Sequence, residues 1–400
     1  MGHSVIKGPR PISLHFANSQ KIWDEAASSG VASLDMDVWN PTVRKRVETL
    51  KAQLQTLDDI EGFNVAVQRK ASERKDAFIA GINTYILRPY ERPASLSMVS
   101  KQIGCCSLHD YGGNGVPILL VPSLVNPYYI LDLMPGRSFA LFLKEQGFRP
   151  FLLDWGSPGD AEVGFGLDAY IRDRLEPVLR HVVSVAGKAV PVVGYCMGGT
   201  LCSALAVRNQ ELISKLVLLA APWNFDTEKP LAGRQNAVEM LDLVESLPAG
   251  ADVGVDLLQT FFTNVDPTLS DRKFRAYDAG KYVGEEADFF SAMEIWANNG
   301  PSLARVAAKN CLGDWYRDNK THNGQWEVAG QIVRPQDISC PTLVAAPEAD
   351  RLVPQESAFA ILTDIANGDK LEPPSGHIGM VVGNRARAGL WEPTARWLKE

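Results

Sequence analysis

The sequence predicts an α/β fold with a doubly wound, mostly parallel sheet. From about residue 95, short apolar runs alternate with amphipathic stretches, a pattern typical of parallel strands joined by helices. The runs are apolar at successive positions, as expected for strands that are covered on both faces. We expect strands at residues 108–111, 116–121, 150–154, 190–193, 215–220 and 342–345, and helices near 138–146, 167–185 and 199–208.

Two connections interrupt this rhythm. The run Gly112-Gly113-Asn114-Gly115 separates the first two strands and predicts a hairpin. Residues 223–337 form a long insertion rich in aromatic residues, which we expect to cap the active site. Aromatic side chains in such an insertion pack into a core of their own more often than they line an acyl channel. The residues concerned include Phe261, Phe262, Phe289, Phe290, Trp296, Trp315, Tyr316 and Trp326.

The N-terminal region, residues 1–94, is predicted to be helical. Asn40 followed by Pro41 is typical of a helix start, and an apolar stripe follows it. A second amphipathic segment is expected to stop before Pro89. We expect the stripe of this region to pack either on the main domain or on a partner. The predicted domains are this helical region and a catalytic domain at 95–400 that carries the insertion. The apolar residues of the two segments are Val43, Val47, Leu50, Leu54, Leu57, Phe78, Ile79, Ile82 and Ile86.

Composition narrows the functional classes. The net charge of -7 and the pI of about 5.5 argue against a nucleic-acid partner. No run approaches the roughly 20 apolar residues of a membrane span, and no signal-like apolar segment follows Met1. We therefore expect a cytoplasmic protein with reduced thiols. The six cysteines lack metal-site spacing, Cys105-Cys106 is not a C-x-x-C motif, and no metal is expected. All but Cys196 are expected to be small buried hydrophobic residues.

A cysteine flanked by glycines follows the expected strand at 190–193. Gly194, Cys196 and Gly198 fit a nucleophile elbow, the sharp strand-to-helix turn of the α/β-hydrolase fold. The glycines are needed because side chains there would collide with the adjoining strand or helix. A thiol accepts an acyl group from a thioester at almost no thermodynamic cost. Because the resulting acyl-enzyme is itself a thioester, the elbow predicts acyl transfer from a thioester donor.

A nucleophilic thiol needs a base, and the base needs an orienting acid. In this fold the chain order is nucleophile, acid, histidine, which leaves His322 and His377 as possible bases. His377 follows the last expected strand, whereas His322 lies in a polar stretch and is interpreted as a surface residue. Asp350 follows the strand at 342–345 and is preferred as the acid over Glu348. Beside His377, the pKa of Cys196 is expected to fall below its usual value.

An oxyanion hole requires two backbone N–H groups. The first is expected from Met197, directly after the nucleophile. The second is expected from the loop after the strand at 116–121, from either Ser123 or Leu124.

Five ordered motifs in the region 95–400 resemble those of poly(3-hydroxyalkanoate) synthases. The segment after the third strand of that family is similar to VPSLVNPYYILDL at 121–133, and its next strand and turn to LLDWGSP at 152–158. Its cysteine-containing elbow resembles GYCMGGT at 194–200. The acid and base motifs correspond to DRLVP at 350–354 and SGHI at 375–378. The family commonly has His directly after the catalytic Asp, where this chain has Arg351.

The resemblance implies an acyltransferase with an α/β-hydrolase fold. It would polymerise (R)-3-hydroxyacyl-CoA, such as 3-hydroxybutyryl-CoA, on Cys196 and release CoA. Asp350 and His377 would complete the triad, and the CoA thioester would be a substrate, with no cofactor. The family also implies a homodimer at polyester granules in the cytoplasm, with a second synthase subunit in some classes.

Two other functions fit the same residues. A cysteine-dependent hydrolase, either a polyester depolymerase or a thioesterase, would pass the acyl group to water, and Arg351 favours this alternative. A non-catalytic granule subunit is the other, although it would have no need for all three triad residues.

Overall fold

The computed structural model describes residues 8–35, 39–228 and 234–400. The chain divides into two compact units. The sheet unit contains residues 91–265 and 295–400, and the helical unit contains the N-terminal helices up to residue 90 together with residues 266–294. The predicted insertion at 223–337 is therefore shared between the two units, because residues 266–294 pack with the N-terminal helices.

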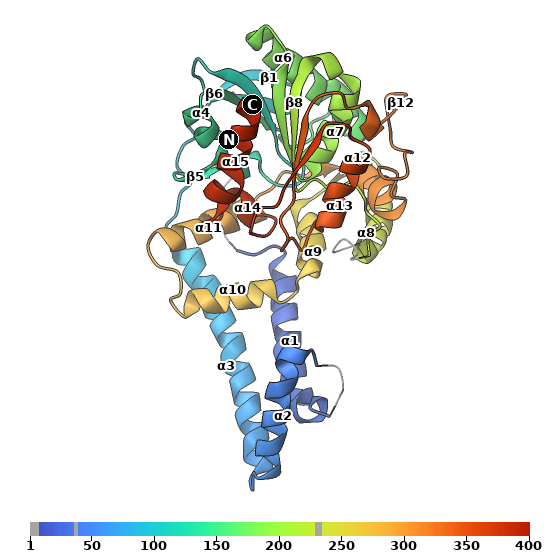
Figure 1. Ribbon diagram of the computed structural model, residues 1–400. Helices are drawn as coiled ribbons and strands as arrows, with labels where there is room; N and C mark the ends of the chain where they lie inside the picture. The colour runs from blue at the N-terminus through green and yellow to red at the C-terminus, as the bar shows by residue number, and fades with distance from the viewer. Residues whose placement is uncertain (1–7, 36–38, 229–233) are drawn as a thin grey trace. The chain divides into compact units, whose positions relative to one another are not determined.

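The sheet unit is built on eight strands in the order β1-β2-β6-β3-β7-β8-β13-β14 (Figure 1). The strands from β6 to β14 run parallel, and β1 and β2 are antiparallel to their neighbours. All six expected strands are present. The bounds are β1 (Met98–Ile103), β2 (Cys106–Asp110), β3 (Val116–Val121), β6 (Phe148–Asp154), β7 (Val190–Tyr195), β8 (Ile213–Leu219), β13 (Thr342–Ala345) and β14 (Gly368–Leu371).

The predicted hairpin between β2 and β3 is wrong. The two strands are consecutive in sequence, but β6 lies between them and pairs with both. Phe151 of β6 is the register partner of Asp110 on one side and of Leu119 on the other. The segment at 112–115 therefore crosses over β6, whose buried apolar residues Phe151, Leu152 and Leu153 lie between the two strands.

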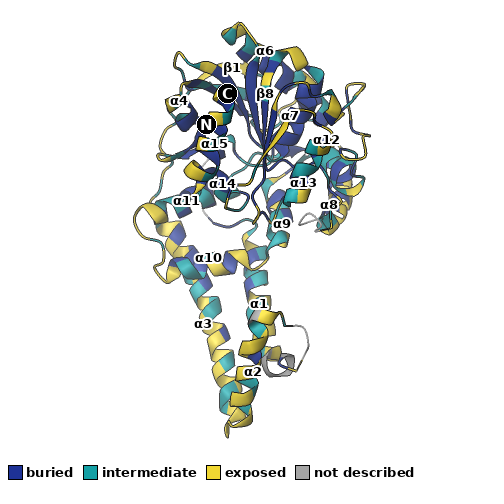
Figure 2. Ribbon diagram, in the orientation of Figure 1, coloured by how far each residue is buried: buried dark blue, intermediate teal, exposed yellow. Residues whose placement is uncertain are grey.

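Helices cover both faces of the sheet, as the apolar runs predict. The expected helices correspond to α4 (Phe139–Glu145), to α6 (Glu176–Ala186) and to α7 (Met197–Arg208). Figure 1 shows α4 and α15 (Glu392–Lys399) on one side of the sheet and α6 and α7 on the other. Leu119 and Val192 share one hydrophobic cluster with Leu179 and Leu201. The central strands are accordingly almost wholly buried (Figure 2).

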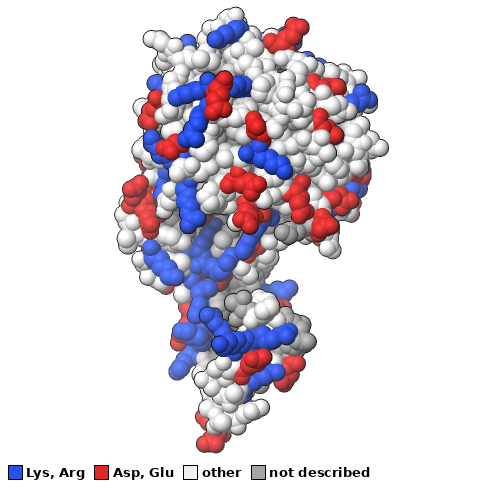
Figure 3. All heavy atoms as spheres, viewed as in Figure 1, with Lys and Arg blue, Asp and Glu red and all other residues white. Residues whose placement is uncertain are grey.

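On the face shown in Figure 3, acidic and basic side chains are interspersed among wide uncharged areas of the sheet unit.

Shorter elements complete the sheet unit. Outside the insertion the further elements are η1 (Tyr128–Leu131), β4 (Asp132–Met134), β5 (Arg137–Ser138), α5 (Leu167–Tyr170), η2 (Ile171–Leu175), η3 (Gln210–Leu212), α13 (Gln355–Phe359), η6 (Ala360–Thr363), α14 (Gly379–Val382) and η7 (Arg387–Trp391).

The part of the insertion within this unit forms an aromatic core of its own. Trp315 packs against Phe225 and Trp326, and Tyr316 packs against Phe225 and Phe261. These contacts agree with the expectation of an internal core. The elements are α8 (Arg234–Ser246), β9 (Asp252–Val253), α9 (Val255–Val265), β10 (Leu303–Ala304), α12 (Arg305–Lys309), the π-helical turn η4 (Asn310–Arg317), β11 (Glu327–Val328), β12 (Gln331–Ile332) and η5 (Pro335–Asp337).

The helical unit confirms the expected N-cap: the Asn40 side chain accepts a hydrogen bond from the Val43 N–H at 3.0 Å. Of the first predicted stripe, Val47 is buried, whereas Leu57 is exposed. The helix that carries the second predicted segment ends at Leu87, before Pro89 as expected. The helices are α1 (Ile12–Ser33), α2 (Pro41–Gln55), α3 (Ile60–Leu87), α10 (Leu269–Asp278) and the first part of α11 (Glu285–Asn298).

Helix α10 belongs to this unit because its side chains complete the core of the N-terminal helices. Phe274 packs against Phe78 and Tyr85 of α3. The buried carboxylate of Asp271 accepts hydrogen bonds from Ser19 and Trp23 of α1, at 2.9 and 2.8 Å. Among the described helices, none combines the length and the apolar character of a bilayer-spanning helix.

Replacing Gly81 with alanine is expected to destabilise the helical unit. A Cβ at this position would lie 2.0 Å from the carbonyl oxygen of Phe274, so α3 and α10 must separate. We expect a loss of about 1–3 kcal/mol in the free energy of unfolding, measured by urea denaturation of the full chain. Asn83→Ala, at an exposed site on the same helix, is the control. Equal stability of the two variants would contradict the close approach.

Candidate active site

The predicted elbow is present between β7 and α7. Cys196 connects them directly, with φ 54° and ψ −130°. A positive φ is strained for a residue with a side chain and is typical of nucleophile elbows. The Cys196 N–H donates to the Leu219 carbonyl at 2.8 Å, which ties the turn to the neighbouring strand.

The glycines around Cys196 are required by close backbone contacts. A Cβ on Gly194 would lie 2.5 Å from the Cα of Gly199. One on Gly198 would lie 2.2 Å from the Pro122 carbonyl oxygen, and one on Gly199 would lie 2.5 Å from the Ala221 Cβ. The start of α7 is thereby pressed against the loop that follows β3.

His377 and Asp350, the predicted base and acid, are hydrogen-bonded. The Nδ1 atom of His377 lies 2.7 Å from Oδ2 of Asp350, and both residues are 8% exposed. The other Asp350 oxygen, Oδ1, accepts the backbone N–H groups of Leu352 and Val353 at 2.8 and 2.9 Å. With Oδ1 saturated in this way, the carboxylate presents a single oxygen to the imidazole.

Electrostatics favour a protonated His377. Burial lowers its pKa, but this effect is outweighed by the charges of Cys196 and Asp350 and by hydrogen bonds to both side chains. Together they raise the pKa of His377 to about 10. The Cys196 side chain therefore lies within reach of the imidazole.

Removing the sulfur should lower the pKa of His377, because one of the charges that raise it is lost. In the wild-type protein we expect the His377 ring to stay protonated as the pH rises through 7, towards its pKa of about 10. In Cys196→Ala its titration should move to lower pH. NMR of histidine-labelled protein measures both titrations, and an unchanged midpoint would show that the two side chains do not interact.

The loop proposed for the oxyanion hole lies beside the elbow. Its Pro122 carbonyl accepts a hydrogen bond from the Trp155 indole at 3.0 Å. In the same loop Ser123 is half-buried and Leu124 is buried. Met197 is the first residue of α7, so its N–H has no acceptor within the helix. Met197 follows Cys196 directly, and the loop of Ser123 and Leu124 approaches the elbow through Pro122, whose carbonyl lies against Gly198.

The rejected candidates lie on the surface. His322 and Glu348 are both exposed, which agrees with the interpretation of His322 as a surface residue. Arg351, next to the acid, is also exposed. In contrast, two of the five cysteines expected to be buried, Cys105 and Cys311, are only half-buried.

Sequence reasoning missed two groups of the insertion that are close enough to feel the charge of Cys196. Burial and the Cys196 charge raise the pKa of the Cys311 thiol to about 12. The pKa of Tyr316 is raised well above its usual value by burial, Cys311 and Cys196. Both residues lie on η4, and π-helical turns are frequent at functional sites. No sequence pattern marks such a turn.

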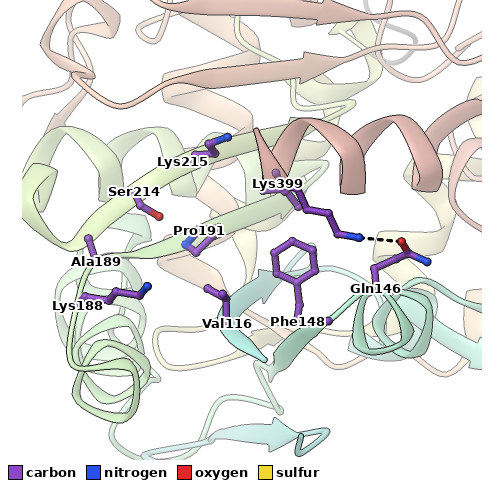
Figure 4. Close-up of a pocket in the computed structure, with 11 residues that line it drawn as sticks. Val116, Gln146, Phe148, Lys188, Ala189, Pro191, Ser214, Lys215 and Lys399 are labelled. Atoms are coloured by element: carbon purple, nitrogen blue, oxygen red, sulfur yellow. Dashed lines mark hydrogen bonds between the residues drawn. The ribbon is translucent and has the colours of Figure 1, made fainter. Parts of the chain in front are cut away.

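A cavity of about 540 Å³ lies at the opposite edge of the sheet. Its lining includes Val116, Phe148 and Pro191 near the starts of β3, β6 and β7, and three lysines surround it (Figure 4). In parallel sheets, sites form at the carboxyl ends of the strands, where Cys196 lies. The cavity is therefore separate from the candidate site. Within residues 8–35, 39–228 and 234–400, no group of three or more His, Cys, Asp or Glu side chains is placed to hold a metal ion.

Comparisons with known proteins agree with this site. Three curated relatives are poly(3-hydroxyalkanoate) polymerase subunits PhaC. Those of Haloferax mediterranei and Haloarcula marismortui are 31% and 30% identical over 71% of this chain, and the matches cover 59% and 61% of those proteins. The chain thus spans about three-fifths of their length. The relative from Allochromatium vinosum is 29% identical, over 71% of this chain and 81% of its own.

A solved structure and a family match define the fold. The non-heme bromoperoxidase BpoC of Mycobacterium tuberculosis matches 77% of this chain and all of its own with a TM-score of 0.50, at 17% identity, which is a likeness of fold alone. Residues 117–383 match the family described as alpha/beta hydrolase fold. The sequence similarity to the PhaC subunits confirms the resemblance to poly(3-hydroxyalkanoate) synthases. The family match over residues 117–383 shows that the chain belongs to the α/β hydrolase fold family.

Proposed function

We propose that this chain is an acyltransferase that polymerises 3-hydroxyacyl-CoA through a thioester on Cys196. The hydrogen-bonded pair of His377 and Asp350, next to a cysteine on a nucleophile elbow, is the observation that carries the proposal. The similarity to PhaC polymerase subunits supports the polyester as product.

In the first half-reaction, Cys196 Sγ attacks the thioester carbonyl of the substrate. The proton of the Cys196 thiol already lies on Nε2 of His377 before the attack, in keeping with the raised pKa of this imidazole, and Asp350 stabilises the imidazolium through Nδ1. The tetrahedral oxyanion accepts hydrogen bonds from the N–H of Met197 and from that of Ser123 or Leu124. The carbon–sulfur bond to CoA then breaks, CoA leaves as a thiol with the proton from His377, and Cys196 carries the acyl group.

In the second half-reaction, the 3-hydroxyl of another unit attacks the acyl-Cys196 carbonyl. His377 takes the hydroxyl proton and returns it to the departing Cys196 sulfur. An ester bond forms and the thioester bond breaks, so the chain grows by one unit. A hydroxyl rather than water must reach the carbonyl for the polymer to grow.

The insertion packs on the loop that follows β3. The Trp296 indole donates to the Pro127 carbonyl at 2.9 Å, and the Gln259 amide lies 3.4 Å from Asn126 Oδ1. A Cβ on Gly300 would lie 2.8 Å from the Val125 carbonyl oxygen. Because the insertion packs on the loop of the proposed oxyanion hole, we expect it to limit the access of water to the acyl group and so to favour transfer to a hydroxyl.

The test is an assay of the purified chain with 3-hydroxybutyryl-CoA and with a longer 3-hydroxyacyl-CoA. We expect CoA release together with polymer, and the ratio of the two rates gives the preferred acyl length. Free 3-hydroxy acid as the sole product would contradict polymerisation.

The alternative is a cysteine-dependent hydrolase, favoured by Arg351 in the position where the synthases commonly have His. Incubation with preformed amorphous polyester separates the two functions. A constant polymer mass supports the synthase, whereas release of soluble acids supports a depolymerase. If loss of Cys196 left cellular polymer unchanged, the chain would instead be a non-catalytic subunit.

The assembly follows from the same proposal. The resemblance predicts a homodimer, a second synthase subunit in some classes, and a location at cytoplasmic polyester granules. Activity of the purified chain alone would show that no second subunit is required, and gel filtration with light scattering measures the dimer.

A further inference from the structure

Two adjacent cysteines, Cys105 and Cys106, lie at the turn between β1 and β2, next to the carboxyl end of β6. Cys105 is half-buried and Cys106 is 1% exposed. Their sulfur atoms are 4.0 Å apart. Both thiols donate to the same acceptor, the Trp155 carbonyl oxygen, at 3.2 Å from Cys105 and 3.5 Å from Cys106. The two side chains therefore point to one place rather than to opposite faces of the sheet.

The buried ion pair of Glu162 and Arg174 lies against this turn. Oε1 of Glu162 accepts the Cys105 N–H at 3.1 Å and the Nε–H of Arg174 at 2.8 Å, and both charged residues are largely buried. A Cβ on Gly104 would lie 2.4 Å from each of these two side chains. The backbone of the cysteine pair is thus held firmly, so the two sulfurs remain neighbours.

The two thiols differ in reactivity. Once Cys105 is ionised, the Cys106 thiol donates to its thiolate, and this hydrogen bond, helped by the Arg174 charge, lowers the pKa of Cys105. The same hydrogen bond and burial raise the pKa of Cys106. Since the thiolate is the nucleophile, the more exposed Cys105 is the attacking sulfur and Cys106 the resolving one.

We propose that Cys105 and Cys106 form a redox-active vicinal dithiol, which exchanges with low-molecular-weight disulfides to give a reversible Cys105–Cys106 disulfide. The Cys105 thiolate attacks one sulfur of the external disulfide, forming a mixed disulfide and releasing one thiolate. Cys106 then gives up its proton and attacks the Cys105 sulfur, which expels the second thiolate. The two protein thiols are oxidised, the external disulfide is reduced to two thiols, and those thiols take up both protons.

The disulfide should be easily reduced. Adjacent Cα atoms are about 3.8 Å apart across a trans peptide, less than the roughly 4.4–6.8 Å usual for a disulfide. The closed ring is strained, and strained disulfides are the labile kind. The pair is thus suited to a switch rather than to a structural cross-link.

Oxidation would reach the candidate active site through Trp155. A disulfide has no S–H, so the Trp155 carbonyl loses both thiol donors. The indole of the same residue holds the Pro122 carbonyl at 3.0 Å, and Pro122 adjoins Gly198 and the proposed oxyanion loop. A misplacement of about 1 Å costs up to about 10²-fold in rate, so a smaller shift of this loop predicts about a tenfold loss. This last step rests on the proposed acyltransferase function, whereas disulfide formation does not.

The first experiment measures the bond itself. Cys196→Ser protein, which removes the competing nucleophile, is equilibrated with mixtures of reduced and oxidised glutathione and then blocked with iodoacetamide. The tryptic peptide 102–137 contains Cys105 and Cys106 and no other cysteine. We expect this peptide to lose the mass of two hydrogen atoms and to regain it with dithiothreitol. Two alkylated thiols throughout, or a lasting glutathione adduct on Cys105, would overturn the proposal.

Two controls complete the test. Phenylarsine oxide should bridge both sulfurs of the unmutated chain with loss of one water, and no bridged peptide 102–137 would also count against a vicinal dithiol. In the activity assay, oxidised glutathione should slow wild-type protein about tenfold more than Cys105→Ser. Equal slowing would mean that the disulfide does not act on the site, and absence of all acyl transfer would refute the proposed function while leaving the mass measurement valid.

Discussion

Replacing Cys196 with alanine is expected to lower the rate of CoA release from 3-hydroxybutyryl-CoA by about 10⁴-fold or more. The variant keeps the elbow and the pair of His377 and Asp350 but has no atom that can carry the acyl group. Rate loss of this size follows when the nucleophile of a triad is removed, because its members act as a unit. CoA release, followed with a thiol reagent, measures the effect.

The matched control is Cys340→Ala, which removes a buried thiol elsewhere in the same unit. It should keep wild-type activity and should not alter the acyl adduct that mass spectrometry detects on Cys196. If Cys196→Ala releases CoA at the wild-type rate, the nucleophile is another group. Cys311, within range of the Cys196 charge, would be the first to examine.

The sheet could be predicted because its strands are covered on both faces. Leu119 and Val192 face one hydrophobic cluster, and their neighbours Leu120 and Val193 are equally buried, so the strands are continuous apolar runs. No local pattern in the sequence indicates the order of the strands within the sheet. The turn at 112–115 has the composition of a hairpin, yet β6 lies between the strands it joins, and only the complete set of pairings decides this.

The pairing of acid and base was predictable because the fold fixes their order in the chain. Asp350 and His377 lie in the loops that follow two late strands of the sheet. These loops meet, and the two side chains form a hydrogen bond there. Tyr316 and Cys311 could not be found in this way, because their proximity to Cys196 depends on the π-helical turn η4. The placement of α10 was likewise hidden, since the approach of Phe274 to Gly81 joins segments far apart in sequence.

Replacing Asp350 with asparagine should lower the rate of acyl transfer by about 10⁴-fold, although the side chain keeps its shape. The reason lies in the fixed hydrogen bonds of Oδ1, which accepts the N–H groups of Leu352 and Val353. The asparagine must place its carbonyl oxygen there, because an NH₂ group cannot accept them. Its NH₂ group then faces His377 and donates to Nδ1. The imidazole proton is therefore forced onto Nε2, the atom that must accept the proton of Cys196.

The same change removes a negative charge that raises the pKa of His377, so NMR should show this pKa falling together with the rate. Glu348→Gln is the matched control, because it neutralises an exposed carboxylate two residues away in the same loop. If Asp350→Asn lowers both the rate and the pKa of His377 and the control lowers neither, Asp350 acts through the imidazole. Equal activity of the two variants would contradict this role, since the orientation of His377 would then depend on some other contact, such as that of its carbonyl with the Tyr195 hydroxyl at 3.3 Å.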